Sequence, residues 1–543
     1  MFVVFEGIDG SGKTTLSNMV ATRLRDAGLV VEHVREGGLF ASSVTQAMRE
    51  LGRDSRNLAL VPRAELMLYL TREVQLFDEV TRDALARADV VIADRFVSTA
   101  EVLAIYGRGL PADEVSPVVA AAVAGVTPDL TVLVDVAPYI ARARRQVSKL
   151  GAAEQKAPSR KGMAGTALQR RLREGYRELA ARDPARWLVI ENTDAALAPT
   201  VDMLVDVVQT ARGAGVAAAR PKIPASRAPR EARDPAAARS SLLAWIDERA
   251  TREPGLAAYF LDGLFGPDFD ERRLALAKQA PHVIAAGLKY LTDPVSWQLR
   301  HELAPLAPGQ VARSIVGEVA MQRDADSMLR ALVEVAPRDV ASAIWSRDDA
   351  LAWELRGRLT GEHLMQSLGG VAGERAWALR DAWLAHARLD EPLQAAIAAG
   401  AVSGVAGDRA WQTRKTARLH APVAALESTY GLADDRAWRW RSKFIERGAK
   451  VVMRSLGLLV DPPAWELRER VVLRCEEVMD TIVGLDDERA WGLRERVIDR
   501  WPASVLKSLG LLSRTERGRD MMARALASAP TDLAVWRQLV LRG

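Results

Sequence analysis

A glycine-rich segment near the N-terminus has the residue types and spacing of a phosphate-binding loop. Residues 7–14 read GIDGSGKT, directly after the apolar run FVVF and before a predicted helix. Glycines let backbone N–H groups close around phosphate oxygens, and the start of the following helix favours negative charge. In this pattern Lys13 reaches the β- and γ-phosphates of a nucleotide, and the Thr14 hydroxyl binds Mg²⁺. The residues predicted to contact the nucleotide are Gly7, Ile8, Asp9, Gly10, Ser11, Gly12, Lys13 and Thr14.

A second polar pair follows another apolar run. The segment VVIADR places Asp94 and Arg95 at the end of a predicted strand. A carboxylate there can hold a metal ion or its waters, and the neighbouring arginine can stabilise a transferring phosphoryl group. Taken alone, such a pair is equally typical of a surface. Because the ends of parallel strands meet at one edge of a sheet, where ligands bind, the pair and the loop together predict one phosphoryl-transfer site.

A basic stretch lies further along the chain. Between Arg142 and Arg173 there are ten basic residues and one acidic residue, Glu154, and glycines interrupt the middle. One interpretation is a solvated basic helix. The other is a lid whose cations close over the phosphates and exclude water. The candidates for this charge role are Arg142, Arg145, Lys149, Arg160 and Lys161.

Short apolar runs separated by helical patterns must position these residues. The predicted strands cover residues 2–5, 30–34, 90–93, 130–136 and 187–190, and helices are expected at 16–25 and 64–86. Apolar strands that alternate with helices indicate an α/β fold with a parallel sheet covered on both faces. We assign this fold to residues 1–212.

Composition sets limits on location and partners. The 543 residues include 75 Lys and Arg against 70 Asp and Glu, a balance too mild to indicate a nucleic-acid or membrane partner. A single cysteine, Cys475, excludes an internal disulfide framework and fits a reducing compartment. No apolar run approaches the roughly 18 residues of a membrane-spanning helix, and the N-terminus lacks the pattern of a signal peptide. The sequence therefore predicts a cytoplasmic protein without a membrane partner.

The chain changes character after residue 212. Residues 213–239 contain four prolines among Ala and Arg without apolar periodicity, which predicts an extended linker. Beyond it, residues 240–543 hold 13 of the 14 tryptophans. We therefore expect three parts, the α/β domain over 1–212, the linker, and an all-α domain over 240–543.

The third part contains a repeat. AWELR stands at 352–356 and 464–468, AWALR at 376–380 and AWGLR at 490–494. Trp411, Trp438, Trp465 and Trp491 follow one another at intervals of 27, 27 and 26 residues, a period typical of helical arrays. Each unit has one apolar helical face and then a second short helix that ends near a glycine, namely Gly457, Gly484 or Gly510. The pattern predicts an α-solenoid.

The repeated aromatic and basic side chains have a structural interpretation. A helical aromatic stripe usually means burial, so the tryptophans are expected in the core between units. The arginines at 356, 380, 468 and 494 are expected to snorkel to solvent or form ion pairs rather than bind a nucleic acid.

Five ordered motifs make residues 1–212 resemble thymidylate kinase, a nucleoside monophosphate kinase of the P-loop class. They are FEGIDGSGKTT (5–15), REGG (35–38), AELMLYLTREVQ (64–75), DRFVSTAEVLAIYGRGL (94–110) and PDLTVLVDV (128–136). The resemblance implies an enzyme that transfers the γ-phosphoryl group of ATP to dTMP and uses Mg²⁺. Positioning and electrostatics supply most of such catalysis, so no covalent nucleophile is expected.

The resemblance also implies roles for single residues. Lys13 and the loop amides hold ATP, and Thr14 and Asp94 hold the metal. Asp9 lies near the sugar 3′-hydroxyl of the acceptor and the metal. The residues that bind the acceptor or its phosphate are Arg72, Arg95, Glu36 and Gly37. The catalytic set implied is Lys13, Arg95, Asp94 and Asp9.

Four positions depart from the family pattern. Gly37 replaces a proline, Leu68 stands where the family often stacks a phenylalanine on thymine, and Ala100 and Leu103 replace polar and tyrosine side chains near the base and sugar. These changes weaken the case for thymine recognition but leave the phosphate chemistry intact.

Two functional classes remain open, and a third, a solenoid that binds nucleic acid, has only the small excess of basic residues in its favour. One is a thymidylate-kinase-like enzyme with a helical-repeat appendage. The other is a regulatory protein whose kinase fold binds or slowly hydrolyses ATP while the solenoid docks a protein. The acceptor base, the partner of the repeats and the oligomeric state, including a homodimer formed through the kinase domain, also remain open.

Overall fold

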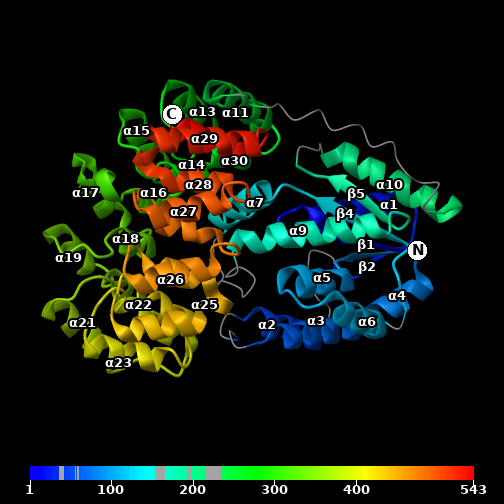
Figure 1. The fold of residues 1–543 in the computed structure, drawn as a ribbon, viewed down its shortest axis with the longest axis horizontal. Helices are drawn as coiled ribbons and strands as arrows, with labels where there is room; N and C mark the ends of the chain where they lie inside the picture. The colour runs from blue at the N-terminus through cyan, green and yellow to red at the C-terminus, as the bar shows by residue number, and fades with distance from the viewer. Residues whose placement is uncertain are drawn as a thin grey trace. The chain divides into compact units, whose positions relative to one another are not determined.

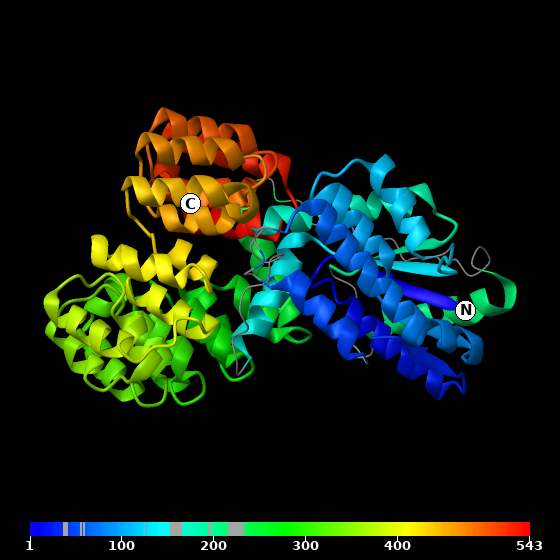
Figure 2. The ribbon, with the colours of Figure 1, turned by 90° about the horizontal axis from the view of Figure 1, so that it is seen from below.

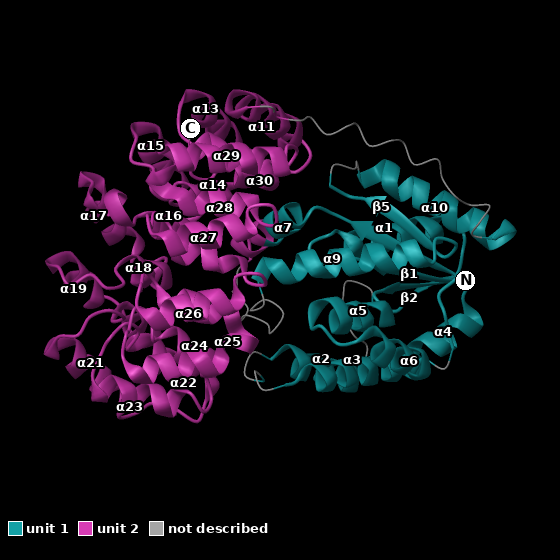
Figure 3. Cartoon of the chain, viewed as in Figure 1, with its two compact units in different colours: residues 1–145, 157–229 teal, residues 146–156, 230–543 magenta. Residues whose placement is uncertain are grey.

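The computed structural model describes residues 1–35, 42–54, 57, 60–123, 125–152, 165–193, 197–215, 232 and 234–542. An α/β part comes first and a long succession of helices follows (Figures 1 and 2). The chain forms two compact units (Figure 3), unit 1 with residues 1–145 and 157–229 and unit 2 with residues 146–156 and 230–543. The division near residue 230 falls inside the segment predicted to be a linker, most of which lies outside the described residues.

Unit 1 is built on a five-stranded parallel sheet, as the alternating apolar runs predict. Its strands are β1 (Phe2–Glu6), β2 (Val31–His33), β3 (Val90–Asp94), β4 (Leu130–Asp135) and β5 (Trp187–Glu191). Their order is β2-β3-β1-β4-β5, with every neighbouring pair parallel. The predicted α/β fold is therefore confirmed.

Helices cover both faces of this sheet. They are α1 (Lys13–Asp26), α2 (Ser43–Arg53), α3 (Pro62–Leu76), α4 (Arg82–Arg87), α5 (Val97–Val102), α6 (Ala112–Ala122), α7 (Pro138–Leu150), α9 (Gly165–Arg182) and α10 (Leu197–Ala214), with π-helical turns η2 (Phe77–Thr81) and η3 (Leu103–Gly107). Val3 and Phe5 pack in the cluster that contains α1 and α10. Phe2 and Val4 pack in the cluster of α3, α5 and α6 on the opposite face. Alternate residues of β1 thus belong to two cores, which explains why the strand is apolar throughout.

The register of the sheet brings the predicted site residues to one edge. Phe5 of β1 stands beside Asp94 of β3, so the loop after β1 and the polar pair after β3 leave the sheet together. Glu6 stands beside Leu133 of β4 on the other side. This edge holds the candidate site.

Unit 2 consists of short helices in pairs. The first helices of the pairs are α13 (Pro267–Leu276), α15 (Pro294–Leu303), α17 (Arg323–Leu332), α19 (Ala350–Arg356), α21 (Glu374–Leu384), α23 (Asp408–Ala417), α25 (Asp435–Leu456), α26 (Pro462–Val471), α27 (Glu488–Val497) and α29 (Glu516–Ser528). The second helices are α12 (Pro254–Phe260), α14 (Pro281–Gly287), α16 (Pro308–Ser314), α18 (Pro337–Ala343), α20 (Gly361–Ser367), α22 (Pro392–Ala401), α24 (Pro422–Glu427), η5 (Glu476–Thr481) and α28 (Pro502–Leu509). The long α25 contains both the first and the second helix of its pair, joined by a kink at Gly448. The remaining elements are α11 (Pro235–Ala250), α30 (Leu533–Arg542) and the 3₁₀ turns η4 (Gly317–Met321) and η6 (Gly510–Arg514). The predicted helical repeat is confirmed.

The two ends of the repeat array pack against each other. Each second helix packs on the second helix of the next pair, while α30 packs on α28 and also on α11, which contacts α12. Arg537 of α30 links the last helix to the first part of the array. Its Nε donates to the carbonyl oxygen of Asp262, which follows α12, at 3.0 Å, and its Nη2 lies 2.6 Å from Asp262 Oδ2. The first and last helices of the array therefore pack on one another.

Glycines end the second helices as predicted. Gly457, Gly484 and Gly510 have φ values of 57°, 71° and 55°. A positive φ is strained for residues with a side chain, which explains why glycine stands at these turns. The expected burial of tryptophans is also confirmed for Trp297, Trp377, Trp411, Trp465 and Trp491.

The prediction that the repeat arginines snorkel or pair is wrong. Arg356, Arg380, Arg468 and Arg494 are buried, and their guanidinium groups donate mainly to main-chain carbonyls. Arg494, for example, donates through Nη1 to Leu485 O at 3.0 Å and through Nη2 to Ile482 O at 2.7 Å.

The physical reason lies in the helix ends, which leave carbonyl oxygens without helical partners. A guanidinium has five donors and can satisfy several such oxygens at once. Arg494 also donates through Nε to Ser508 Oγ at 3.0 Å, and its charge lies 4.8 Å from the centre of the Trp491 ring. Burial lowers the pKa of Arg494 to about 10. The arginine therefore joins consecutive pairs of helices from inside the core.

Within the residues that the structure describes, no helix has the length and apolar character needed to span a membrane.

Candidate active site

The loop between β1 and α1 is closely packed by its surroundings. Gly10 and Gly12 have φ values of 91° and 94°. A Cβ atom at Gly10 would collide with the carbonyl oxygen of Ala141, and one at Gly12 would lie 2.6 Å from Asn192 Nδ2. Both positions therefore require glycine for conformation and for space.

Lys13 begins α1 and its side chain turns back over the loop. Its Nζ donates to the carbonyl oxygen of Ile8 at 3.4 Å, and the residue is buried. Burial and, to a smaller extent, the positive charge of Arg95 lower the pKa of Lys13 to about 8. Phosphate oxygens at this point would reverse both effects because they bring compensating negative charge.

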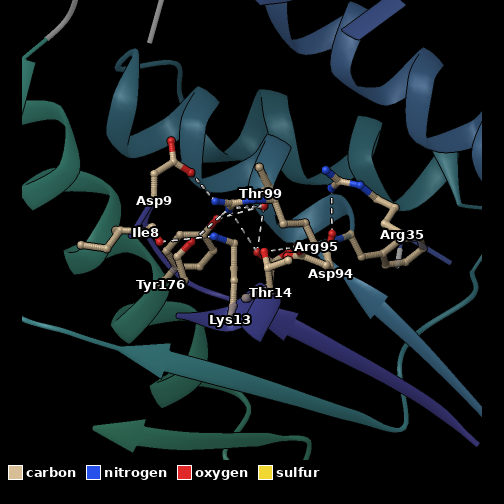
Figure 4. A network of polar contacts seen from close by, with 12 residues as sticks. Ile8, Asp9, Lys13, Thr14, Arg35, Asp94, Arg95, Thr99 and Tyr176 are labelled. Atoms are coloured by element: carbon tan, nitrogen blue, oxygen red, sulfur yellow. Dashed lines mark hydrogen bonds and ion pairs between the residues drawn. The ribbon is translucent and has the colours of Figure 1, made fainter. Parts of the chain in front are cut away.

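Thr14 and Asp94 meet although they lie on different elements. Thr14 Oγ1 donates to Asp94 Oδ2 at 2.5 Å (Figure 4). Asp94 is buried, and its second oxygen, Oδ1, has no hydrogen-bond partner among the described residues. Burial opposes ionisation of this carboxyl, but the nearby charges of Lys13, Arg95 and Arg35 hold its pKa below the ordinary value. An ionised oxygen without a partner, beside a hydroxyl, fits Mg²⁺ or one of its waters.

This arrangement needs few protein ligands. Within the described part of the chain, no group of three or more His, Cys, Asp or Glu side chains could hold a metal ion by itself. Mg²⁺ at nucleotide sites usually keeps several waters and takes one or two protein oxygens together with substrate phosphates. The Thr14 and Asp94 pair is consistent with that kind of site.

Arg95 is held in an unusual conformation. Its φ is 79°, a left-handed value that is rare for a residue with a side chain. Its Nη1 donates to Gly7 O at 3.0 Å, to Thr99 Oγ1 at 3.1 Å and to Tyr176 Oη at 3.1 Å. Strained backbone of this kind is maintained only where the surroundings fix it, and such positions cluster at functional sites.

Two carboxylates face the Arg95 guanidinium. Asp9 Oδ1 accepts from Arg95 Nη2 at 2.5 Å and remains 40% exposed. Glu6 is fully buried, accepts from Thr99 Oγ1 at 2.8 Å and lies 3.9 Å from Arg95. Burial raises the pKa of Glu6, against the opposing charge of Arg95. The network fixes Arg95 directly above the phosphate-binding loop, as Figure 4 shows.

Arg35 is a further candidate site residue; it begins the REGG segment, but the sequence patterns assigned it no role. It follows β2, is buried and donates through Nη1 to the carbonyl oxygen of Asp94 at 2.7 Å. Burial lowers the pKa of Arg35, while the charges of Asp94 and Glu73 oppose this effect. The sequence did contain a signal for this role, because Arg35 follows an apolar strand. That strand, β2, pairs with β3, which ends in the predicted Asp94–Arg95 pair.

Arg72 of α3 belongs to a second cluster of basic residues, together with Arg49 and Arg53 of α2. It is buried, forms an ion pair with Glu73 and lies with its charge 4.8 Å from the centre of the Tyr69 ring. A small cavity beside it is lined by Met48, Arg49, Gly52, Leu68, Tyr69 and Arg72. Burial lowers the pKa of Arg49, and the charges of Arg53 and Arg72 lower it further. Arg49, which the sequence patterns did not indicate, thus belongs to the same electropositive region.

The structure separates the lid candidates. Arg145 is half-buried, and burial lowers its pKa while the charge of Asp9 opposes the shift. Arg142 is exposed and donates to Thr166 Oγ1 at 3.4 Å, and Lys149 is exposed near the end of α7. Arg145 is therefore the candidate that lies against the loop. Four predicted residues, Glu36, Gly37, Arg160 and Lys161, lie outside the described residues.

A parallel α/β sheet, a glycine-rich loop between the first strand and helix, and an aspartate at the end of β3 define a protein of the P-loop class. The family model for thymidylate kinase matches residues 5–198. Thymidylate kinase of Solidesulfovibrio magneticus is 38% identical over 209 residues, which is 38% of this chain and 96% of that protein. Thymidylate kinase of Trichlorobacter lovleyi is 35% identical over 195 residues, 36% of this chain and 90% of that protein. The chain therefore belongs to the thymidylate kinase family.

A solved structure of thymidylate kinase from Ehrlichia chaffeensis is also similar, at 23% identity and a TM-score of 0.29. The match covers 38% of this chain and 98% of that one.

Proposed function

We propose that unit 1 transfers the γ-phosphoryl group of ATP to dTMP and yields dTDP. The observation that carries this proposal is the convergence of Lys13, Thr14 and the Asp94–Arg95 pair at one sheet edge, in a chain of the thymidylate kinase family. Phosphoryl transfer needs positioned cations and a metal more than a covalent nucleophile, and this edge carries such cations together with oxygen atoms that would hold a metal.

The donor side of the site is the loop. Backbone N–H groups of residues 10–14 and the start of α1 would hold the β- and γ-phosphates, and Lys13 would exchange its contact with Ile8 O for a phosphate oxygen. Thr14 and Asp94 would hold Mg²⁺, which neutralises charge on the phosphates when it is bound.

Arginines would stabilise the transferring group. Arg95 already has its guanidinium fixed above the loop, so little reorganisation is needed when charge develops. Arg145 lies against the same loop and faces Asp9, and we assign to it the role predicted for the lid. Asp9 keeps a partly exposed carboxylate beside Arg95, in the place proposed for contact with the acceptor sugar.

The acceptor side would be the electropositive region around α2 and α3. Arg72 would bind the acceptor phosphate with Arg95, and Arg49 adds a further positive charge. Leu68 lines the neighbouring cavity and offers the base only apolar contact, because it lacks an aromatic ring. Loss of one aromatic stack is worth about 0.5–1.5 kcal/mol, roughly a tenfold change in affinity at most. We therefore propose that discrimination between pyrimidine bases is weaker than the family pattern implies.

We propose that the repeat domain is an interaction domain for a protein partner. Helical arrays present extended surfaces for such partners. The first helices of the pairs in unit 2 carry many exposed ion pairs, for example Arg330 with Glu354 and Arg496 with Glu469, so their surface has mixed charge. A mixed surface of this kind favours a protein over a nucleic acid.

The experiment for the proposed activity identifies the product. The full chain would be incubated with γ-labelled ATP, Mg²⁺ and dTMP, and the nucleotides separated. The proposal expects label in dTDP and none when dTMP is omitted. Release of labelled phosphate without dTDP would contradict it and favour the regulatory alternative.

A further inference from the structure

Asn192 lies directly after β5, far from the loop in sequence but against it in space. Its side-chain Nδ2 donates to the carbonyl oxygen of Ser11 at 2.7 Å, across 181 residues, and the residue is buried at 6% exposure. The same Nδ2 would lie 2.6 Å from a Cβ at Gly12. The amide group therefore packs directly on the peptide bond between Ser11 and Gly12.

The geometry of a peptide bond gives this contact a consequence. The bond is planar and trans, so its C=O and N–H groups point in opposite directions. With the Ser11 oxygen fixed on Asn192, the Gly12 N–H is turned away from Asn192. Gly12 is the N-cap of α1, where backbone N–H groups are available to an anion. The hydrogen bond thus orients one of the donors on which a phosphate-binding loop depends.

Asn192 itself is held on two sides. Its backbone N–H donates to Asp135 O at the end of β4 over 2.7 Å, and its carbonyl oxygen accepts from Arg144 Nη1 of α7 at 3.0 Å. The next residue, Thr193, makes a different contact, because its Oγ1 accepts from the backbone N–H of Ala137 at 3.2 Å. Two adjacent buried side chains therefore have separate targets, the loop for Asn192 and the β4–α7 connection for Thr193.

We propose that Asn192 is a positioning residue for the donor phosphates. It acts through the Ser11–Gly12 peptide, whose N–H it aims at the nucleotide, and does not touch substrate through its side-chain amide. This inference rests on the proposed function of the loop as the ATP site. It extends that function by assigning part of the donor affinity to a residue outside the glycine-rich motif.

The test compares three variants of the full chain. Asn192→Ala removes the donor, and Asn192→Asp replaces it with a group of equal size that cannot donate and carries negative charge. Thr193→Val is the matched control, because it removes the neighbouring buried hydroxyl, which accepts from the backbone N–H of Ala137 at 3.2 Å. Binding of ADP is measured by calorimetry, and the KM values for ATP and dTMP are measured separately.

The expected pattern is specific to the donor. Loss of one hydrogen bond predicts that Asn192→Ala raises the Kd for ADP and the KM for ATP by about 3- to 10-fold. Asn192→Asp raises them further, since its carboxylate faces the Ser11 oxygen. In the Asn192 variants the KM for dTMP changes less than about twofold, because the Ser11–Gly12 peptide belongs to the donor side of the site. Thr193→Val keeps the affinity for ADP, because its hydroxyl contacts the backbone of Ala137.

Other outcomes would overturn the inference. Unchanged ADP binding in both Asn192 variants would show that the contact does not position the loop. An equal loss in Thr193→Val, or an equal rise in both KM values, would reduce Asn192 to general support of the fold. If the unmodified chain binds ADP and phosphorylates dTMP, these results contradict only the role of Asn192. If the unmodified chain does not bind ADP, the proposed function fails and this inference fails with it.

Discussion

Thr14 and Asp94 are 80 residues apart in the sequence, yet the Thr14 hydroxyl donates to one oxygen of the Asp94 carboxylate at 2.5 Å. The other oxygen is buried and has no partner among the described residues. Burial of an ionised oxygen without a hydrogen bond is unfavourable. Such an oxygen is expected in a native structure where a ligand or metal ion binds to it. The pair is the structural basis for placing Mg²⁺ at this edge of the sheet.

Asp94→Asn is expected to impair metal use selectively. The amide keeps the shape of the side chain but removes its charge, so kcat should fall on the order of 10- to 100-fold and more Mg²⁺ should be needed for half-maximal rate. The measurement is initial rate against Mg²⁺ concentration. Asp78→Asn is the control, because Asp78 is exposed on η2 and forms an ion pair with Arg82, the first residue of α4. An unchanged Mg²⁺ dependence in Asp94→Asn would remove Asp94 from the metal site.

Lys13→Ala is expected to abolish most of the phosphoryl transfer and leave the fold intact. Removal of a preorganised cation at the transferring group predicts a loss of at least about 100-fold in kcat. The ligand-free protein should not lose stability, because burial already lowers the pKa of Lys13 to about 8 and makes its charge unfavourable there. Turnover and thermal unfolding are measured on the same preparation. Near-normal turnover would mean that the donor site lies elsewhere.

Arg441→Lys is expected to destabilise the repeat domain. Arg441 is fully buried and donates to Leu432 O and Thr429 O at 2.7 Å each and to Ser455 Oγ at 3.0 Å. An ammonium cannot reach these oxygens as a guanidinium does, so we expect a loss of about 3 kcal/mol.

Denaturant unfolding followed by tryptophan fluorescence reports on this domain, since 13 of the 14 tryptophans lie beyond residue 240. Arg439→Lys on the exposed side of the same helix should change stability by less than about 0.5 kcal/mol. Equal stability of the Arg441 and Arg439 variants would show that the buried hydrogen bonds are not important for the array.

Arg537→Ala is expected to loosen the junction between the two ends of the array. It removes the contacts of α30 with Asp262 and exposes the first pairs of helices to local opening. Hydrogen exchange should increase in α11, α12 and α30 while α20 to α24 remain as protected as before. Arg519→Ala, on the exposed surface of α29, serves as control. Unchanged exchange at α11 and α12 would show that closure does not depend on this contact.

The strands were predictable because the sheet is covered on both sides. Each strand is an apolar run, and all five predicted runs lie within about two residues of the observed bounds. The π-helical turns at 77–81 and 103–107 were not predictable, because a single inserted residue barely changes the apolar periodicity of a helix.

The residues that meet at the sheet edge were predictable where they belong to a local motif. Lys13, Thr14 and the Asp94–Arg95 pair lie in continuous segments whose chemistry can be recognised from their spacing. Arg35 and Asn192 were missed because their contacts cross 59 and 181 residues and depend on strand register. The repeat arginines were misinterpreted for a related reason. Arginine is usually exposed, and the carbonyl oxygens that keep these side chains buried are visible only in the packed helices.

The most direct test of the proposed function is the specificity constant for several acceptors. The measurement is kcat/KM for dTMP, dUMP, UMP and dCMP with ATP and Mg²⁺ under one set of conditions. We predict transfer to dTMP, with dUMP within roughly tenfold of it because Leu68 cannot stack on the base. A strong preference for dTMP over all the others would contradict the relaxed specificity. Absence of transfer to any of them would contradict the kinase itself.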